Sequence, residues 1–487
     1  MDVRVRYAPS PTGLQHIGGV RTALFNYLFA RANGGRFILR VEDTDRERFS
    51  EEALEDLYDT LGWLGIKWDE GPDIGGEYAP YVQSARVEMY REYAEKLIQK
   101  GDAYYCFCTP ERLDGLRKKQ RKEKLSIGYD RHCSGLSMDE ALSLRKGGKR
   151  CVVRFRVPEN GETAFYDEIL GEIVRENREI NPDPVILKPD GFPTYHLANV
   201  VDDHFMEISH ILRAQEWIPS GALHVLLYNS FGWKVPKYCH LPMVMGKDGQ
   251  KLSKRHGSTS VRDFRASGYL PEALINYIAL LGWSFDDSRE FFTLRELEGV
   301  FDLKKINKAR GVFDYRKLEW FNGQYIRKME NSCLKEGIIP ILERDGVVGS
   351  PPSDEEMCVI DGMIPLIKER LHFLSDVSEM SEFLFRDNLE YPKEDLVSRK
   401  VDEAKTIEIL KAAGEIVKGF VSRTDEENED IFRKTAEDLG VKLGSLLMPL
   451  RVAITGKSVS PPLFGSFRLL GEERVLKRIN QAIALFQ

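Results

Sequence analysis

The sequence of 487 residues contains no run of apolar residues long enough to span a bilayer, and its N-terminus lacks the apolar core of a signal peptide. The first predicted strand follows almost directly on the initial methionine. We therefore expect a cytoplasmic protein without membrane contact. An internal repeat and a low-complexity tail are also lacking, so nothing indicates a repeat array.

Cysteine is scarce. The seven cysteines are unevenly spaced, which does not fit the disulfide framework of a small secreted domain. Three of them lie at positions 106, 108 and 133. The other four are predicted to be buried apolar side chains, namely Cys151, Cys239, Cys333 and Cys358.

A strong excess of one charge is lacking as well. Apolar residues make up 42% and charged residues 30% of the chain, and the net charge is −7. This composition and length indicate a globular protein of three or more domains, without suggesting a nucleic-acid partner. Two stretches differ: residues 109–156 contain 14 Lys or Arg against 6 Asp or Glu, and residues 304–328 contain 8 against 2. Such stripes can follow a phosphate backbone, although solvated helix faces have the same composition.

The most informative stretch that is present lies at residues 6–19 and reads RYAPSPTGLQHIGG. Apolar residues alternate before it and recur at helical spacing after it, and residues 36–41 have the composition of another strand. We therefore predict a β-α-β unit whose connecting turn lies at the carboxyl end of a parallel strand. Such turns, with glycines at a helix N-terminus, bind phosphates. The alternative is a structural turn with an incidental histidine.

A second motif, KDGQKLSKR, occupies residues 247–255 and predicts a turn followed by a compact basic loop. The two motifs resemble the HIGH and KMSKS signatures of class I aminoacyl-tRNA synthetases. Three segments are similar to the glutamyl-tRNA synthetases of the bacterial type: APSPTG at 8–13, VEDTD at 41–45 and YHLANVVDDH at 195–204. The resemblance covers essentially the whole chain. The first motif ends in Gly19 where the class often has a second histidine, and KLSKR replaces KMSKS; both variants look normal for this family.

The resemblance implies a multidomain fold, with an α/β Rossmann-type parallel-sheet catalytic domain, an α+β insertion and an all-α C-terminal half. The absence of a strand-rich C-terminal half separates the chain from glutaminyl-tRNA synthetase, whose anticodon module is a β-barrel. Residues 240–245 are predicted to form one strand that leads into the KLSKR loop. The expected parts are the first half of the catalytic domain (1–103), a connective insertion that binds the acceptor end of tRNA (104–187), the second half of the catalytic domain (188–245), a stem-contact domain with the KLSKR loop (246–323) and an anticodon-binding region of two subdomains (324–487).

The implied reaction has two steps. The α-carboxylate of glutamate attacks the α-phosphorus of ATP, and the 2′-hydroxyl of the terminal adenosine of tRNA then takes the acyl group. Because a carboxylate is already ionised at neutral pH, the first step needs positioning and charge neutralisation rather than a general base. The resemblance assigns catalysis to His16, Lys251 and Lys254. It assigns the binding of ATP, with Mg²⁺ as a bridge, to Thr12, His16, Gly18, Gly19, Lys251, Ser253 and Lys254.

Selection of glutamate requires cations for two carboxylates. Arg6 and Arg213 are the candidates, because the guanidinium fork matches a carboxylate. Glutamine would leave a buried arginine unpaired, a penalty large enough to dispense with an editing site. Taken one at a time, such residues more often form surface ion pairs or core contacts. The resemblance implies a glutamate site made of Arg6, Ala8, Ser10, Glu42, Tyr195, Asn199, Arg213 and Trp217.

The three remaining cysteines have the spacing of metal ligands and could supply three of the four ligands of a tetrahedral zinc ion. Some family members complete this site with a histidine two residues after the last cysteine, where this chain has Gly135. Tyr129 stands where some relatives use a tyrosinate, and His132 is the other candidate. Three reduced cysteines in a strand and loop are the alternative. The predicted zinc site consists of Cys106, Cys108, Tyr129 and Cys133.

Three other functions remain open: a glutamyl transferase that acts on a modified nucleoside of tRNA, a small-molecule adenylyltransferase, and a non-catalytic tRNA-binding paralogue. The helical C-terminal half disfavours the first, the basic stretches and KLSKR loop the second, and the intact motifs the third. The implied partners are L-glutamate, ATP and tRNA(Glu), and the chain is expected to be monomeric. The sequence leaves open whether tRNA(Gln) is also charged.

Overall fold

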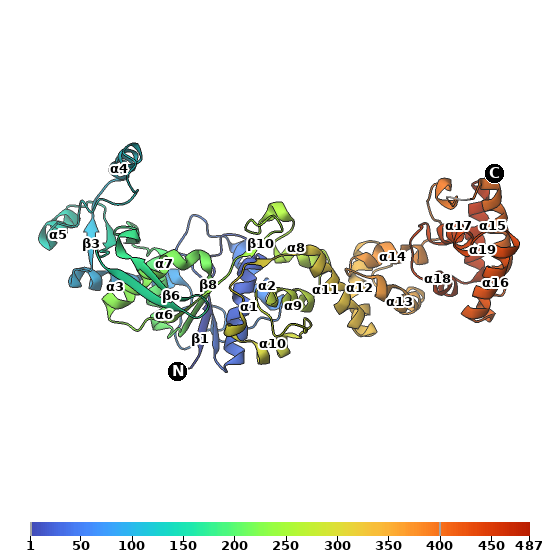
Figure 1. Ribbon diagram of the computed structural model, residues 1–487, viewed down its shortest axis with the longest axis horizontal. Helices are drawn as coiled ribbons and strands as arrows, with labels where there is room; N and C mark the ends of the chain where they lie inside the picture. The colour runs from blue at the N-terminus through green and yellow to red at the C-terminus, as the bar shows by residue number, and fades with distance from the viewer. Residues whose placement is uncertain (1, 399–400) are drawn as a thin grey trace. The chain divides into compact units, whose positions relative to one another are not determined.

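The computed structural model describes residues 2–398 and 401–487, and for Lys254 it describes the backbone but not the side chain. The chain forms two compact units, Met1–Arg265 with Leu274–Asp314 and Ala266–Ala273 with Tyr315–Gln487. Figure 1 shows that the strands belong to the first unit and that the second is helical. None of the described helices is long and apolar enough to cross a membrane.

The first unit opens with the predicted β-α-β unit, in which β1 (Arg4–Tyr7) and β2 (Arg36–Leu39) pair in parallel and α1 (Ile17–Ala32) connects them. β2 ends before the predicted residue 41, because the chain turns there to pair with a loop: the Val41 amide donates to the Tyr81 carbonyl at 2.9 Å. The other strands are β3 (Ala103–Cys106), β4 (Val152–Phe155), β5 (Glu162–Asp167), β6 (Gly171–Glu176), β7 (Val185–Leu187), β8 (His210–Ala214), β9 (Lys237–Leu241), β10 (Val244–Met245) and β11 (Gly311–Val312).

Helices surround these strands. Several begin at a side-chain cap; α2, for example, begins after Ser50, whose hydroxyl accepts from the Ala53 amide. α8 (Val261–Ala266) and α9 (Pro271–Ala279) lie where the chain passes between the two units. The other helices of the first unit are α2 (Glu51–Trp63), α3 (Val87–Lys100), α4 (Pro110–Lys122), α5 (Met138–Lys146), α6 (Tyr195–Phe205), α7 (Ile218–Phe231) and α10 (Leu294–Val300).

A four-stranded sheet with the order β6-β5-β9-β8 stands beside the β1–β2 pair. β8 and β9 are parallel, and β5 meets β9 at the register pair Asp167↔Tyr238. At the start of β8 the Ser209 amide donates to the Arg4 carbonyl at 2.9 Å, which links this sheet to β1. Segment 104–187 therefore does two things: its β5–β6 hairpin extends the sheet next to α7, and its strands β4 and β7 form a separate antiparallel sheet with β3.

Two further sequence expectations require correction. The single strand predicted over residues 240–245 is interrupted, because Pro242 has no amide hydrogen to donate to a ladder, and β9 and β10 form instead. Of the four cysteines predicted to be buried, only Cys239 is; Cys151 is half-buried, and Cys333 and Cys358 are exposed. Both exposed cysteines lie on polar faces of helices that bury their leucine and isoleucine side chains on the opposite side.

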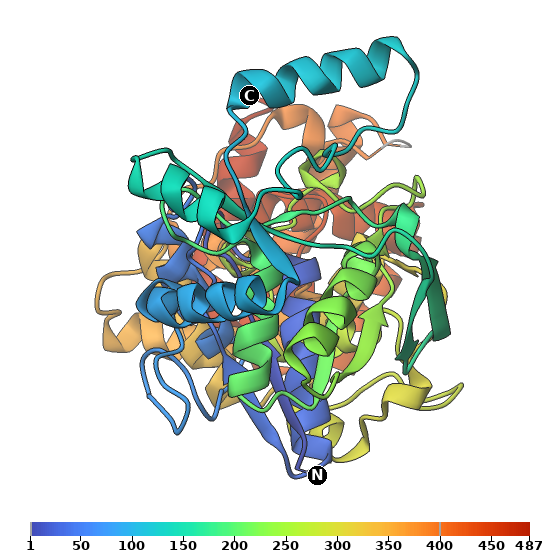
Figure 2. The same cartoon turned by 90° about the vertical axis from the view of Figure 1, so that its left-hand side faces the viewer.

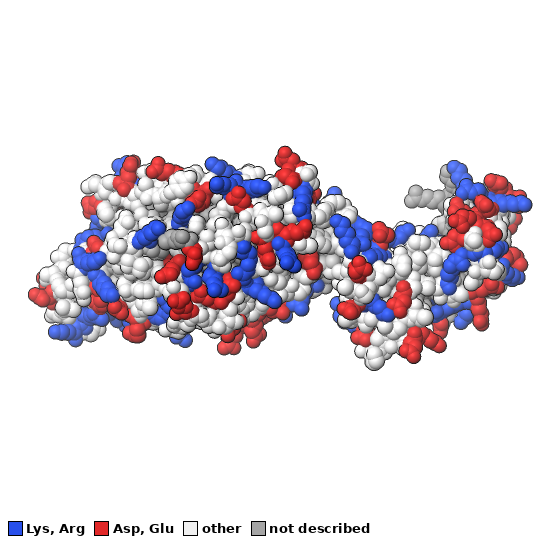
Figure 3. All heavy atoms as spheres, turned by 90° about the horizontal axis from the view of Figure 1, so that it is seen from below, with Lys and Arg blue, Asp and Glu red and all other residues white. Residues whose placement is uncertain are grey.

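The basic segment 109–156 contains the helix α4, which has no buried residue. It stands clear of the strands of its own unit in two perpendicular views (Figures 1 and 2). On the face shown in Figure 3, by contrast, basic and acidic side chains alternate over both units. Local concentration of positive charge is therefore a property of particular segments rather than of that whole face.

The second unit packs its helices around one core of leucine, isoleucine, valine and phenylalanine side chains. Ile367 and Leu371, fully buried, and Ile479 are examples of the apolar stripes that helical spacing places inside. The helices are α11 (Tyr315–Lys328), α12 (Asn331–Arg344), α13 (Asp354–Ile367), α14 (Asp376–Phe385), α15 (Glu403–Val417), α16 (Asp425–Asp438), α17 (Leu443–Thr455), α18 (Leu463–Leu470) and α19 (Glu472–Ala484).

Candidate active site

A cavity of about 1270 Å³ opens in the first unit, at the carboxyl ends of β1 and β8. Its walls come from loops and helix starts that are far apart in the sequence, mainly within residues 6–22, 42–48, 188–199, 212–217, 241–253 and 259–263. The carboxyl ends of parallel strands are where open α/β sheets bind ligands, because the strand order changes there and the loops diverge. Residues of both sequence motifs line this cavity.

The first motif forms one wall, with His16 as the N-cap of α1. The Nδ1 atom of His16 accepts hydrogen bonds from the Gly18 amide at 3.1 Å and the Gly19 amide at 3.4 Å, so a neutral His16 carries its proton on Nε2. Desolvation in the cleft and the nearby Lys251 cation lower the pKa of His16. A Cβ atom at Gly19 would lie 2.8 Å from the Tyr7 hydroxyl oxygen, so the close backbone at this position requires glycine.

The second motif forms the facing wall. The Nζ atom of Lys251 lies 2.6 Å from the Glu216 carboxylate, and both residues line the cavity. Ser253 also lines it, and its amide donates to Nδ1 of His256 at 3.0 Å. The side chain of Lys254 lies outside the described part of the chain. Thr12 is exposed on the turn and is not among the residues that line the cavity.

All eight residues predicted to bind glutamate line this cavity, namely Arg6, Ala8, Ser10, Glu42, Tyr195, Asn199, Arg213 and Trp217. Arg213 is buried, and its guanidinium donates at 3.1 Å to the Tyr195 hydroxyl and to the Trp217 carbonyl. The rings of Tyr195 and Trp217 are 4.4 Å apart. No carboxylate oxygen of the described residues lies within 4.0 Å of this guanidinium, so its charge faces the cavity without an anionic partner.

Arg6 has a different environment. Its Nε and Nη2 atoms donate to both oxygens of Asp203 at 2.9 and 3.1 Å. Asp203 also accepts from Arg40 at 2.7 Å, and Arg40 donates to Glu42 at 3.0 Å. Burial works to raise the pKa of Asp203, but the two guanidinium groups outweigh it and hold that pKa below its ordinary value. The four side chains thus form one buried charge network that reaches the cavity at Arg6 and Glu42.

Sequence reasoning missed Arg40 and Asp203 as parts of this site. Asp203 was inside a family-like segment, 195–204, but nothing in one sequence shows that it faces Arg6, nearly 200 positions away. Arg40 directly follows the consecutive apolar residues that end β2, and it is fully buried. Only the packing of α6 against β1 and β2 brings these charges together.

Three buried or half-buried histidines, His196, His224 and His240, surround Arg213. Burial and the Arg213 charge lower the pKa of His196 to about 4 and that of His224 well below its ordinary value, and burial lowers that of His240 despite the nearby Asp167. In the unfolded chain these groups bind protons below about pH 6.5, whereas in the folded protein they stay neutral.

This difference predicts a loss of stability in mild acid. Because the folded pKa is the lower one, the stabilisation is complete above about pH 6.5 and is lost as pH falls toward 4; His196 alone accounts for about 2 kcal/mol at pH 5. Thermal unfolding between pH 7.5 and 5 measures it. A melting temperature that rises or stays constant over this range would contradict the assignment of neutral histidines.

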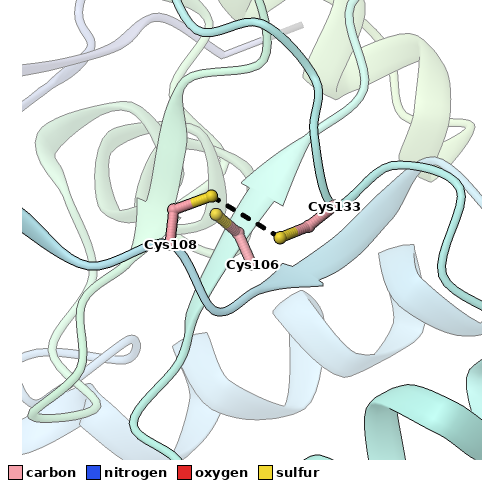
Figure 4. Close-up of side chains that lie close together, drawn as sticks. All are labelled: Cys106, Cys108 and Cys133. Atoms are coloured by element: carbon pink, nitrogen blue, oxygen red, sulfur yellow. Dashed lines mark hydrogen bonds between the residues drawn. The ribbon is translucent and has the colours of Figure 1, made fainter. Parts of the chain in front are cut away.

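A second candidate site lies in segment 104–187. The side chains of Cys106, Cys108 and Cys133 point toward one another (Figure 4). Their sulfur atoms lie within 4.8 Å of one another, and those of Cys108 and Cys133 are 3.6 Å apart. The hydroxyl oxygen of Tyr129 lies 3.3 Å from the Cys106 sulfur and 3.4 Å from that of Cys108. His132, the other candidate for a fourth ligand, is exposed and does not belong to this cluster of described residues.

Comparison with known proteins gives a consistent result. The family model for the catalytic domain of class I tRNA synthetases (E and Q) matches residues 2–320, and an anticodon-binding domain model matches residues 319–483. A glutamate–tRNA ligase of Borreliella burgdorferi is 54% identical over 482 residues, which cover 99% of this chain and 98% of that protein. A glutamate–tRNA ligase of Treponema denticola is 50% identical over 503 residues, which cover 99% of each chain.

Among solved structures, a glutamate tRNA ligase from Elizabethkingia meningosepticum in complex with its amino acid superposes with a TM-score of 0.88, at 36% identity over 99% of both chains. A glutamate–tRNA synthetase from Elizabethkingia anophelis gives a TM-score of 0.86, at the same identity, over 99% of this chain and 100% of the other. The two facing motifs, the helical second unit and these matches agree: the chain belongs to the class I tRNA synthetases of the E and Q type.

Proposed function

We propose that this protein ligates L-glutamate to the 3′-terminal adenosine of tRNA(Glu), using ATP and passing through glutamyl-adenylate. The observation that carries this proposal is the composition of one cavity. The glycine turn and Lys251 suit a triphosphate, and Arg213 offers a buried cation that no carboxylate of the described residues pairs with. The curated relatives named above are glutamate–tRNA ligases, which supports the same reaction.

On the ATP side, the positive end of the α1 helix dipole and the Nε2–H of His16 face the phosphates. The Gly18 and Gly19 amides donate to Nδ1 of His16, and the lack of side chains at these two glycines allows close approach. Lys251 moves from Glu216 to the departing pyrophosphate. Lys254, Ser253 and Thr12 belong to the same two loops and are assigned to ATP by the family motifs. Mg²⁺ supplies charge neutralisation on the phosphates when it is bound with ATP.

On the glutamate side, Arg213 binds a carboxylate of the substrate. The Tyr195 hydroxyl and the Trp217 carbonyl accept hydrogen bonds from the Arg213 guanidinium and so fix its orientation. Arg6 directs part of its positive charge into the cavity, and its ion pair with Asp203 fixes the position of the Arg6 guanidinium. Glu42, buried beside Arg40, faces the α-ammonium group, and Ala8, Ser10 and Asn199 complete the wall. Glutamine offers a neutral amide to Arg213 and leaves the cation unpaired.

Segments outside the cavity bind tRNA. Segment 104–187, with its exposed basic helix α4, binds the acceptor end, and segment 246–323 contacts the stem. The helical region 324–487 binds the anticodon, in agreement with the family model that matches residues 319–483. The protein acts as a monomer, which size-exclusion chromatography with light scattering measures directly.

The decisive experiment is glutamate charging of two purified transcripts, tRNA(Glu) and tRNA(Gln). We expect tRNA(Glu) to be charged. Charging of tRNA(Gln) as well would identify a non-discriminating enzyme, and charging of tRNA(Gln) alone a dedicated mischarging enzyme. Charging of neither transcript, where a control synthetase is active, would overturn the proposed function.

We also propose that Cys106, Cys108, Tyr129 and Cys133 hold a structural zinc ion. Sulfur atoms that bind one zinc ion at about 2.3 Å lie about 4 Å apart, close to the 3.6 Å between Cys108 and Cys133. Burial raises the pKa of Tyr129, so the neutral phenol is favoured in the metal-free chain, and a cation would reverse that preference. The site would fix the loop that follows β3 beside α4.

This proposal predicts about one zinc per chain in protein purified without chelator. Cys108→Ser removes one thiolate and is expected to lower the zinc content at least tenfold. The matched control is Cys358→Ser, because Cys358 is an exposed cysteine of the second unit. This substitution should leave the zinc content unchanged. Elemental analysis that finds less than about one zinc per three parent chains would contradict the site.

A further inference from the structure

We infer that Asp167 and His240 are positioning residues that orient Arg213 for the glutamate carboxylate. This inference rests on the proposed role of Arg213. The Nε atom of Arg213 donates to Nε2 of His240 at 3.0 Å, and Nδ1 of His240 lies 2.7 Å from Oδ2 of Asp167. All three side chains are buried, with Asp167 and His240 completely inaccessible.

The proton positions follow from the chemistry of arginine. A guanidinium has five donors and no acceptor, so Nε2 of His240 must accept, and the ring must be neutral with its proton on Nδ1. That proton is donated to Asp167. A neutral ring is also the form that burial and the Arg213 charge favour, since both lower the pKa of His240. Asp167 therefore fixes the tautomer that presents an acceptor to Arg213.

Asp167 is itself held rigidly. Its Oδ1 atom accepts from the Ile169 and Leu170 amides, both at 2.9 Å, and its Oδ2 atom also accepts from the His240 amide at 2.9 Å. Four hydrogen bonds thus satisfy the buried carboxylate. Burial raises the pKa of Asp167, but these bonds, above all that of His240, outweigh it and lower the pKa below its ordinary value.

The arrangement leaves Arg213 oriented but not neutralised. Its guanidinium donates to a neutral imidazole, a phenol and a backbone carbonyl, with Nδ1 of His224 a further 3.4 Å contact. Arg6, in contrast, forms a two-pronged ion pair with Asp203. Asp167 acts on Arg213 through the imidazole rather than by direct contact, so the guanidinium keeps its capacity to bind a substrate carboxylate.

The origin of Asp167 adds to the inference. It is the last residue of β5, in the segment predicted as the acceptor-binding insertion, and it reaches His240 only because β5 joins β9 at this position. The segment that follows α4 and α5 therefore supplies a fixed point of the amino-acid site. The pair is a structural link between that segment and the selection of glutamate.

The test uses the full-length protein in ATP–pyrophosphate exchange with tRNA(Glu) present, varying glutamate, ATP and glutamine in turn. His240→Leu removes the acceptor and is expected to lower kcat/KM for glutamate about 100-fold, with KM for ATP within about twofold of the parent. The preference for glutamate over glutamine should fall at least tenfold. His240→Gln places an amide oxygen near the position of Nε2 and should restore kcat/KM to within about tenfold of the parent.

Asp167→Asn is the smaller change. If the amide oxygen stays on the Ile169 and Leu170 amides, the amide NH₂ faces His240, and the ring then presents Nε2–H to Arg213, donor against donor. We expect the same glutamate-specific loss. His210→Leu is the matched control, because His210 lies on β8 beside Ser209 and not against Arg213; it should leave kcat/KM for glutamate within about threefold.

Two outcomes would overturn the inference: equal losses for glutamate and ATP in His240→Leu, or parental kinetics for glutamate in Asp167→Asn. If His240→Leu fails to fold, Asp167→Asn and His240→Gln test the positioning role instead. Parental kinetics for glutamate in Asp167→Asn would then refute that role. Arg213→Gln separates this inference from the proposed function. Parental glutamate binding in Arg213→Gln would refute the role of Arg213 itself, whereas a loss there with parental Asp167→Asn would refute only the positioning pair.

Discussion

Replacing Lys251 by alanine is expected to slow glutamyl-adenylate formation by about 100-fold or more, because it removes a cation that neutralises developing phosphate charge. ATP–pyrophosphate exchange with glutamate and tRNA(Glu) measures this directly. The Lys251 side chain lines the cavity opposite His16, whose pKa it helps to lower. The rate should fall more than ATP binding weakens, since the charge on the departing pyrophosphate develops in the transition state.

Lys247→Ala is the matched control for this experiment. Lys247 lies in the same loop, pairs with Asp314 at 2.9 Å and does not line the cavity, so its variant should retain a rate within about threefold of the parent. A parental rate in Lys251→Ala would remove the KLSKR loop from the mechanism. The Glu216 ion pair does not prevent Lys251 from reaching ATP: both partners are largely exposed, and such pairs contribute about 0–1 kcal/mol.

The largest effect on stability is expected from Asp203→Ala. The substitution leaves Arg6 and Arg40 buried without the carboxylate that joins them, and removing one partner of a buried ion pair costs about 3–5 kcal/mol. We expect a lower melting temperature together with weakened glutamate binding, because Arg6 loses its fixed direction toward the cavity. Thermal unfolding and glutamate titration of the same preparation measure the two effects.

Asp45→Ala provides the comparison for Asp203→Ala. Asp45 pairs with Arg48 on the surface, where solvent screens the interaction, so its loss should change the melting temperature little. If the two variants melt at the same temperature, the buried network contributes no more to stability than a surface ion pair does. The structural role assigned to the network would then be refuted. If Asp203→Ala is destabilised but binds glutamate as the parent does, Arg6 does not depend on Asp203 for its function.

The local motifs of this chain could be interpreted without a structure because their chemistry is contained in consecutive residues. The turn before α1 contains His16 and is followed by two glycines. Such a turn requires only a strand, a helix N-terminus and small residues that follow one another in the sequence. The helical second unit was predictable for a similar reason, since helical periodicity is a property of neighbouring residues. The cysteine spacing likewise predicted a cluster that the folded chain brings together.

Local pattern failed where a residue's surroundings come from distant segments. Cys333 and Cys358 look like core residues by type but lie on exposed helix faces, and the strand expected over residues 240–245 is split at Pro242. Arg40 directly follows the apolar end of β2 and is buried as a charge, because α6 supplies Asp203 to pair with it. In each case the partner that decides the outcome is set by packing, which one sequence does not contain.

The sequence by itself determined the family, the β-α-β start, the two nucleotide motifs and the residue types that suit ATP and glutamate. Tertiary structure alone decided how those residues are charged and oriented. Among the described residues it gave Arg6 a carboxylate partner and Arg213 none, and it placed His240 of β9 against Arg213 and Asp167 of β5 against that histidine. The physical reason is that hydrogen bonds and ion pairs depend on distances of about 3 Å between segments that are far apart along the chain.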